Sequence, residues 1–191
     1  MTDRRTFLKA AGAGLAAIAA SPALTAARAP FRYHRVAVDA RFTESLAFGR
    51  AAALAGQAVT AVERGDVTGF WYDELHRQWR IAPQAIAGMT GREPFFCLDL
   101  LARDQALRTV MTVEHRIEAD HAVHHASAPA SMMAGIEAAI RRDDWAAGMA
   151  EAALRPGAPH EPRIQRMWRT PAAAPASPQT LISWIIAPIR A

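Results

Sequence analysis

The stretch RVAVDARFTESLAFGRAAALAGQAVTAV, residues 35–62, contains the pattern that decides the fold. Residues 35–39 form a short apolar run that ends in an acid, and residues 58–62 form a second short apolar run. Between them, residues 43–54 fit a helix, because Thr43 can cap its start. A strand, a helix and a second strand in this order predict a parallel βαβ unit.

The same alternation continues along the chain. Asp66 can cap a second helix, and a third strand over residues 84–89 leads to a third helix that begins near Pro94 and runs to about residue 107. Three strand–helix units predict an α/β protein with a three-layer, Rossmann-like or flavodoxin-like sheet whose N-terminal part is parallel. The second helix is amphipathic, because its apolar side chains recur every four residues on one face: Val67, Trp71, Leu75 and Trp79.

The C-terminal half has a different pattern. Residues 109–117 and 122–126 are strand-like and separated by a short turn, which predicts an antiparallel pair. Residues 131–154 favour a long helix that a charged cluster at residues 141–144 interrupts. A last apolar run over residues 180–186 predicts a strand that docks into the sheet. The C-terminal part of the sheet is therefore expected to be antiparallel.

Prolines crowd the segment before this last strand. Their density favours an extended segment on the surface. After residues 1–29 we therefore expect an α/β domain over residues 30–154, a Pro-rich surface segment over residues 155–178, and a C-terminal strand of the same domain over residues 179–191. The prolines of the segment are Pro156, Pro159, Pro162, Pro171, Pro175 and Pro178.

The N-terminus has the features of a leader. Residues 3–9 read Asp-Arg-Arg-Thr-Phe-Leu-Lys, and a mildly apolar stretch follows over residues 10–20. This stretch is too short to span a bilayer, which takes about 20 apolar residues, and Ala27-Arg28-Ala29 offers a small-x-small cleavage site. The leader resembles the twin-arginine (Tat) signal peptide of bacterial exported proteins through Arg4, Arg5, Phe7 and Leu8. The one departure from that family is Asp3, where serine or threonine is usual.

This resemblance covers the leader alone, and it implies a destination. It implies export by the twin-arginine translocase, removal of residues 1–29, and a periplasmic location. Proteins of this route fold before export, often around a cofactor or with a partner, such as a periplasmic redox enzyme. No later segment is long enough to cross a bilayer, so we expect no stable membrane span after cleavage.

Two features of the composition exclude function classes. The formal net charge is +4, but removal of the leader leaves 18 basic and 17 acidic residues, a net charge of +1 with no basic patch for nucleic acid. Cys97 is the only cysteine, so the chain cannot form an intramolecular disulfide. Its apolar neighbours predict that Cys97 is a small buried hydrophobe.

A candidate ligand site follows from the expected strand order. In a flavodoxin-like order the loops after the first and third strands meet at the carboxyl edge of the sheet, where helix N-termini attract polar or anionic ligands. Glycines there let the backbone approach a ligand, and an arginine can bind a carboxylate or phosphate through two N–H groups. The candidate ligand-binding residues are Asp39, Arg41 and Ser45 after the first strand, Asp66 and Thr68 after the second, Thr90 and Arg92 after the third, and His115.

The histidines cluster in the expected hairpin. If it turns at Ala119-Asp120, opposed residues sum to 239, and His115 faces His124 closely enough for two imidazoles to share a metal ion. A three-residue turn would instead oppose Glu114 and His124 and remove the pair. A solvated hairpin of mixed charge is the simpler interpretation, because no standard metal-ligand spacing is present.

The sequence leaves three roles open, of which the third is a structural chain with no ligand. The first is a periplasmic protein that binds a small polar or anionic ligand, or that serves as an accessory to a cofactor-bearing partner. The second is a small periplasmic hydrolase, which metal bound by the histidines at residues 115–125 could assist. No nucleophile elbow, dinucleotide fingerprint or phosphate-binding loop is present, so the sequence names neither catalytic residues nor a cofactor.

Overall fold

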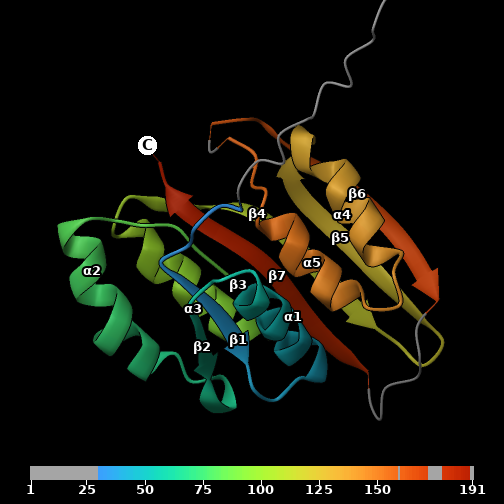
Figure 1. The fold of residues 1–191 in the computed structure, drawn as a ribbon, viewed down its shortest axis with the longest axis horizontal. Coiled ribbons are helices and arrows are strands. Elements are labelled where there is room, and N and C mark those ends of the chain that lie inside the picture. The colour runs from blue at the N-terminus through green and yellow to red at the C-terminus, as the bar shows by residue number, and fades with distance from the viewer. Residues whose placement is uncertain (1–29, 159, 172–177, 190–191) are drawn as a thin grey trace, which may run out of the picture.

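The computed structural model describes residues 30–158, 160–171 and 178–189, which form a seven-stranded mixed sheet with helices on both faces (Figure 1). The first three strands run parallel, and every later pairing is antiparallel. The predicted α/β fold class, with a parallel N-terminal and an antiparallel C-terminal part, is confirmed. The strands, in the spatial order β2-β1-β3-β7-β4-β5-β6, are β1 (Arg35–Asp39), β2 (Val59–Val62), β3 (Ile86–Thr90), β4 (Leu107–Ile117), β5 (His121–Pro129), β6 (Arg163–Pro171) and β7 (Gln179–Pro188).

The predicted leader lies outside the described residues. Its residues Arg4, Arg5, Phe7 and Leu8 fall in the range 1–29, so the signal peptide and its cleavage stay predictions. Within the described ranges, no helix combines the length and the apolar composition that crossing a bilayer requires.

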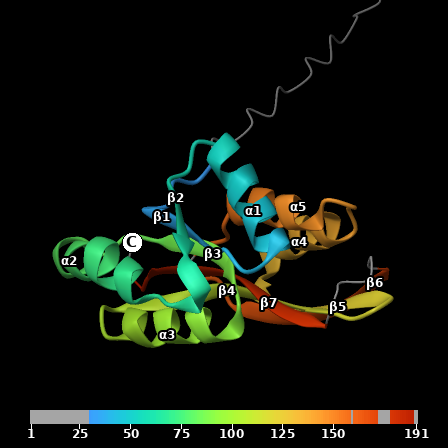
Figure 2. The same cartoon turned by 90° about the horizontal axis from the view of Figure 1, so that it is seen from below.

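The helices form the two outer layers (Figures 1 and 2). On one face lie α1 (Thr43–Leu54), α4 (Met133–Ile140) and α5 (Trp145–Ala153). On the other lie α2 (His76–Ile81), which continues a π-helical segment over Phe70–Leu75, and α3 (Arg92–Arg103). Two short 3-10 turns, Glu63–Gly65 and Ala130–Met132, complete the elements.

The strand order explains why α1 and α2 lie on opposite faces. The strands β2 and β3 flank β1 on either side, and crossovers between parallel strands are right-handed. The two crossover helices must therefore cover opposite faces of the sheet. The carboxyl ends of β1 and β3 lie next to each other at the point where the direction of winding reverses.

Each face of the sheet has its own apolar core. Under α1, α4 and α5, the large buried side chains include Phe48, Met111 and Met149. Under α2 and α3, they include Trp79 and Trp184. Burial of each such side chain contributes about 1.5–3 kcal/mol to folding, so the sheet is held from both sides.

The Pro-rich segment differs from its prediction. Residues 155–178 are not only a surface segment, because β6 (Arg163–Pro171) lies within them and pairs with β5 along its length. The reason is the spacing of the prolines. The eight residues 163–170, between Pro162 and Pro171, contain none, and a strand at the edge of the sheet tolerates proline at its ends.

Helix boundaries and one cysteine also differ from expectation. The third helix runs over Arg92–Arg103 and ends four residues before the predicted end, because β4 already begins at Leu107. The predicted long helix is broken at the charged cluster into α4 and α5, as expected. Cys97 is exposed and not buried, because α3 turns Leu98 and Ala102 toward the sheet instead.

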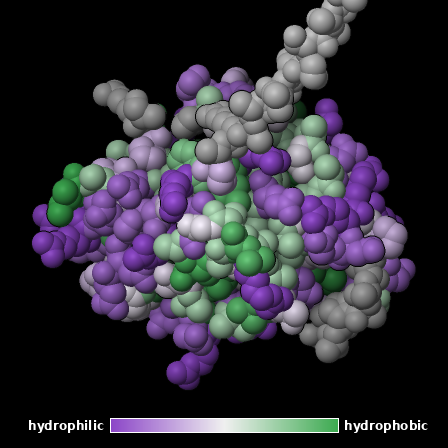
Figure 3. Space-filling model, in the orientation of Figure 1, coloured by the Kyte–Doolittle hydropathy of each residue, from purple (hydrophilic) through white to green (hydrophobic). Residues whose placement is uncertain are grey.

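Figure 3 shows the surface on the side of α1, α4 and α5. Hydrophobic residues gather near the middle, over α1, and hydrophilic residues surround them. The exposed apolar side chains of α1 include Leu46 and Leu54, the second of which is 90% exposed.

The close approach of β1 and β3 generates a stability prediction. A Cβ on Gly88 would lie 2.4 Å from the carbonyl oxygen of Ala37 and 2.6 Å from the ring of Trp184. We therefore expect Gly88→Ala to lower the free energy of unfolding by about 3 kcal/mol. Gly135→Ala is the control, because a Cβ on this helical glycine meets nothing within 4 Å and should stabilise by up to about 1 kcal/mol. Equal denaturation midpoints in urea for the two variants would contradict the packing described here.

Candidate functional site

The turns after β1 and β3 meet at one rim, as the strand order predicted. The backbone N–H of Gly91, at the start of α3, donates to Oδ2 of Asp39 at 3.2 Å. Ser45 of α1 donates its hydroxyl to the carbonyl of Met89 and accepts the N–H of Asp39 at 2.7 Å. The two turns are therefore linked directly by hydrogen bonds.

The carboxylate of Asp39 is fully buried at this rim. Its Oδ1 accepts the backbone N–H and Nε of Arg41, at 3.2 and 2.9 Å, and its Oδ2 accepts Nη2 of the same arginine at 2.8 Å. Burial alone would raise the pKa of Asp39, but the hydrogen bonds from Arg41 and Gly91 outweigh it and hold the pKa below its ordinary value. Asp39 is therefore a charged group whose partners come from the protein itself.

Arg41 joins the third turn to the other two. A Cβ on Gly65, in the turn after β2, would lie 2.6 Å from Nη2 of Arg41, and a Cβ on Gly91 would lie 3.0 Å from the same atom. Gly65 also has a φ of 80°, a conformation that other residues rarely adopt. The guanidinium of Arg41 therefore lies against both glycines and covers the rim.

The other predicted ligand residues form contacts within the protein. The hydroxyl of Thr90 accepts Nε1 of Trp184 at 3.1 Å, inside the core. Asp66 accepts the N–H of Thr68 at 2.8 Å in an exposed turn. Arg92 binds Oε1 of Glu114 at 3.0 Å.

Arg92 and His115 do not share a site. Glu114, the partner of Arg92, and His115 are consecutive residues of β4, so their side chains point to opposite faces of the sheet. Arg92 belongs to the α3 face, and His115 is buried under α5. The prediction that Arg92 and His115 border one crevice is wrong, because the two side chains lie on opposite faces of the sheet.

An open cavity lies beside the closed rim, and we call it the Trp145 cavity. Its volume is about 810 Å³. It is bordered by the first turn of α1, the end of the β4–β5 hairpin, the loop between α4 and α5 with Trp145, and the end of β6 with Thr170. The rim and the cavity are neighbours along the chain, because Thr43, which borders the cavity, lies two residues after Arg41.

A buried pair of histidines lies beneath Trp145. The hairpin has the register that sums to 239, so His115 opposes His124 and Glu114 opposes His125, as predicted for a two-residue turn. His115 and His124 are both fully buried, whereas His125 is exposed on the opposite face. The ring of Trp145 lies over them, with centroid distances of 4.6 Å to His115 and 5.7 Å to His124.

The pair belongs to a chain of four hydrogen-bonded side chains. Nδ1 of His115 lies 2.7 Å from Nδ1 of His124. At the inner end, Nε2 of His115 lies 2.8 Å from Oγ of Ser183 in β7. At the outer end, Nε2 of His124 lies 2.9 Å from Oγ1 of Thr170, which borders the Trp145 cavity. We call this chain the histidine relay.

Both imidazoles of the histidine relay are neutral at neutral pH. Burial lowers the pKa of His115 well below its ordinary value, and the neighbouring His124 lowers it further. Burial lowers the pKa of His124 to about 4. A neutral imidazole has one donor and one acceptor nitrogen, so the N–H groups must all point one way along the relay, toward Thr170 or toward Ser183.

The predicted metal site has two ligands in place but no complete set. Among residues 30–158, 160–171 and 178–189, no group of three or more His, Cys, Asp or Glu side chains could hold an ion. The Nδ1 atoms at 2.7 Å are also closer than the roughly 3.3 Å that two nitrogens keep on one tetrahedral zinc ion. The contact is a hydrogen bond, and metal binding by His115 and His124 stays a prediction.

Three residues of this site were missed from the sequence. Ser183 is a polar residue at an inward position of a strand, between Leu181 and Ile185, and that alternation could have revealed it. Thr170 lies in the Pro-rich segment, whose composition does not indicate the strand β6. For Trp145 the sequence offered no comparable indication.

Comparison of the chain with protein-family models, curated proteins and solved structures found no match. The site is therefore interpreted from its own geometry.

The lowered histidine pKa values predict a pH dependence of stability. The unfolded chain binds protons at these histidines below its pKa of about 6.5, whereas the folded protein resists protonation down to about pH 4. The contribution of this pair to stability should be constant above about pH 7 and fall as the pH drops from there, with a slope of up to about 1.4 kcal/mol per pH unit for each histidine.

The measurement is urea denaturation between pH 7.5 and pH 4.5. We expect His124→Gln to flatten the profile and His125→Gln, in the exposed neighbour, to leave its slope unchanged. A His124→Gln profile as steep as that of the unsubstituted protein would contradict a neutral buried pair.

Proposed function

We propose that this protein is an exported binding protein that holds a small polar molecule in the Trp145 cavity. The observation that carries the proposal is the histidine relay, which runs from the core to the cavity and ends there at the Thr170 hydroxyl. Burying four polar side chains costs free energy unless each is hydrogen-bonded, and apolar side chains at the same positions would avoid this cost. A ligand-binding role for their outer end gives a reason for their presence.

The size and lining of the cavity support a small-molecule ligand. Sites for small molecules have volumes of roughly 300–1,000 Å³ and combine aromatic surface with a few polar groups. The Trp145 cavity has about 810 Å³, one large aromatic side chain at Trp145, and a hydroxyl group at Thr170. Its opening lies beside the rim that the strand order favours for ligands.

The charges around the cavity indicate a polar ligand and not a strong anion. Arg141 is bound to Glu137 at 2.8 Å, and Arg142 is bound to Asp144 and to Glu151. The remaining charged residues of the lining are of both signs and have no ion pair within the described residues: Glu44, Asp143 and Arg169. A molecule with both donor and acceptor groups, or with charges of both signs, fits this balance.

The relay makes Thr170 adaptable. When the imidazoles donate toward Thr170, its own hydroxyl hydrogen is free for an acceptor on the ligand. When the imidazoles donate toward Ser183, Thr170 donates to His124, and its lone pairs can accept from the ligand. Thr170 can therefore offer either a donor or an acceptor to a ligand.

Export is supported by the leader alone, through its resemblance to twin-arginine signal peptides. Translocation of an already folded chain suits a protein whose site depends on a complete buried network. A periplasmic redox enzyme as a partner also rests on the leader and not on the cavity.

A thermal-shift screen at pH 7.5 with amino acids, sugars and hydroxy acids tests the proposal. A ligand at 100 times its Kd adds about 2.7 kcal/mol to the free energy of unfolding, which such a screen detects. For a molecule that binds, we expect Trp145→Ala and Thr170→Val each to weaken the affinity about tenfold or more.

Thr180→Val is the matched control, since Thr180 lies on β7 outside the cavity. The control should leave the affinity unchanged. Equal affinity in all three variants would contradict the proposal, and a screen of these three classes without any stabilising molecule would also count against it.

A further inference from the structure

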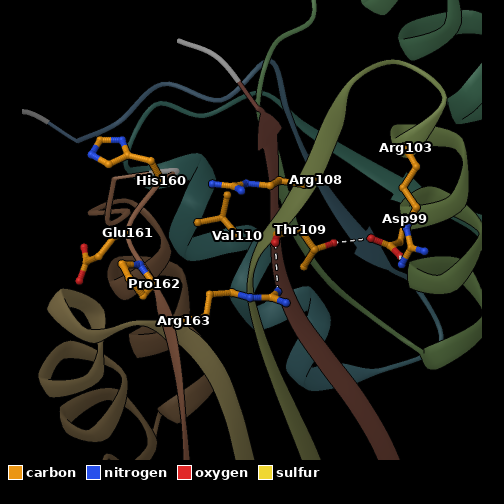
Figure 4. A pocket seen from close by; sticks show the side chains of 9 residues that line it. All are labelled: Asp99, Arg103, Arg108, Thr109, Val110, His160, Glu161, Pro162 and Arg163. Atoms are coloured by element: carbon orange, nitrogen blue, oxygen red, sulfur yellow. Dashed lines mark hydrogen bonds and ion pairs between the residues drawn. The ribbon is translucent and has the colours of Figure 1, made fainter.

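A second cavity opens at the other end of the antiparallel half of the sheet. The strand β4 begins at Leu107, but β5 pairs with it only from Thr112 onward, so the two strands leave a gap before that residue. The pairing of β4 with β7 is also irregular there, with a bulge between Thr109 and Met111. A cavity of about 350 Å³ fills the gap between the starts of β4 and β6 (Figure 4).

Arginines from two strands reach into this cavity. Figure 4 shows the side chain of Arg108, from the start of β4, and that of Arg163, from the start of β6, on either side of Val110. Arg163 donates through Nη1 to the carbonyl oxygen of Thr109 at 3.0 Å, which fixes its guanidinium at the gap. Arg108 forms no ion pair within the described residues.

The nearby carboxylates are already engaged with other partners. Asp99 accepts the hydroxyl of Thr109 through Oδ1 and a guanidinium N–H of Arg103 through Oδ2, both at 2.5 Å. On the other side of the cavity, Glu161 accepts the backbone N–H and the hydroxyl of Ser131, at 2.9 and 2.7 Å.

Glu161 does not neutralise the arginines. The hydrogen bonds from Ser131 lower the pKa of the Glu161 carboxyl. The carboxylate is therefore ionised and already has hydrogen-bond donors in Ser131. In Figure 4 its carboxylate points away from Arg108 and Arg163. The two guanidiniums therefore face a cavity in which no described carboxylate is directed at them.

We propose that this cavity, bordered by Arg108 and Arg163, is a second binding site that takes a compact oxyanion of the phosphate type. Two positively charged groups from different strands border a space large enough for a tetrahedral anion, and a guanidinium binds such an anion through two parallel N–H groups. The bulge at Val110 borders this space, and bulges are common beside binding sites.

The source of the anion is either free phosphate or the phosphoryl group of a larger molecule. Both present the same oxygens to the arginines. The site is separate from the Trp145 cavity, with which it shares no lining residue.

Isothermal titration calorimetry of the full chain tests the proposal. Inorganic phosphate and glycerol 3-phosphate are titrated separately at pH 7.5 and at constant ionic strength. We expect saturable binding of at least one of them, and an affinity about tenfold or more lower in Arg108→Gln and in Arg163→Gln.

Arg166→Gln is the matched control. Arg166 is an exposed arginine of the same strand, three residues beyond Arg163, and it does not border the cavity. This variant should bind as the unsubstituted chain does. Melting temperatures of all variants check that Arg108→Gln remains folded; among the described residues, the Arg108 side chain forms no hydrogen bond that this change would break.

The two titrants separate the sources. Tighter binding of inorganic phosphate indicates a site for the free ion, and tighter binding of glycerol 3-phosphate indicates a phosphorylated molecule. Absence of saturable binding for both, or the same affinity in Arg108→Gln, Arg163→Gln and Arg166→Gln, would overturn the proposal.

Discussion

The buried carboxylate of Asp39 is the constraint on which the arrangement of the site depends. A buried charge without partners is costly, so its contacts with Arg41 and Gly91 have to form together. Gly91 stands at the N-terminus of α3, where the helix dipole also favours a negative charge. One side chain thereby fixes the turn after β1 against the start of α3, and Arg41 extends the link to the turn after β2.

This link has a consequence for function. At the edge where parallel sheets commonly bind anions, the protein supplies its own anion, and the position is filled by Asp39. The open space lies one element away, over the antiparallel strands, where the histidine relay reaches the Trp145 cavity. Because both imidazoles are neutral, the end of the relay at Thr170 offers the cavity a hydrogen bond and no charge.

The sequence predicted the parallel half of the fold well. The helix Thr43–Leu54 and the strands beside it follow from local patterns, and the contact between the turns after β1 and β3 follows from the strand order. For the histidine hairpin the sequence left two registers open, and the structure has the one with a two-residue turn, in which His115 opposes His124. These features depend on neighbours in the sequence or on a general rule of topology.

Features that depend on distant partners were not predicted. The strand β6 is stabilised by its pairing with β5, which composition rich in proline concealed. The separation of Arg92 from His115 depends on which face of β4 each element covers, and the role of Ser183 depends on β7 entering the sheet between β3 and β4. Local patterns contain no information on these pairings, since any of several strand orders would satisfy them.

The central claim is that ligands bind in the Trp145 cavity and not at the rim closed by Asp39. A crystal structure of the protein with a molecule that stabilises it tests this claim most directly. The account predicts density for that molecule between Trp145 and Thr170, with the contacts of Asp39 to Arg41 and Gly91 intact. Density at the rim, with Arg41 turned away from Asp39 to contact the ligand, would contradict it.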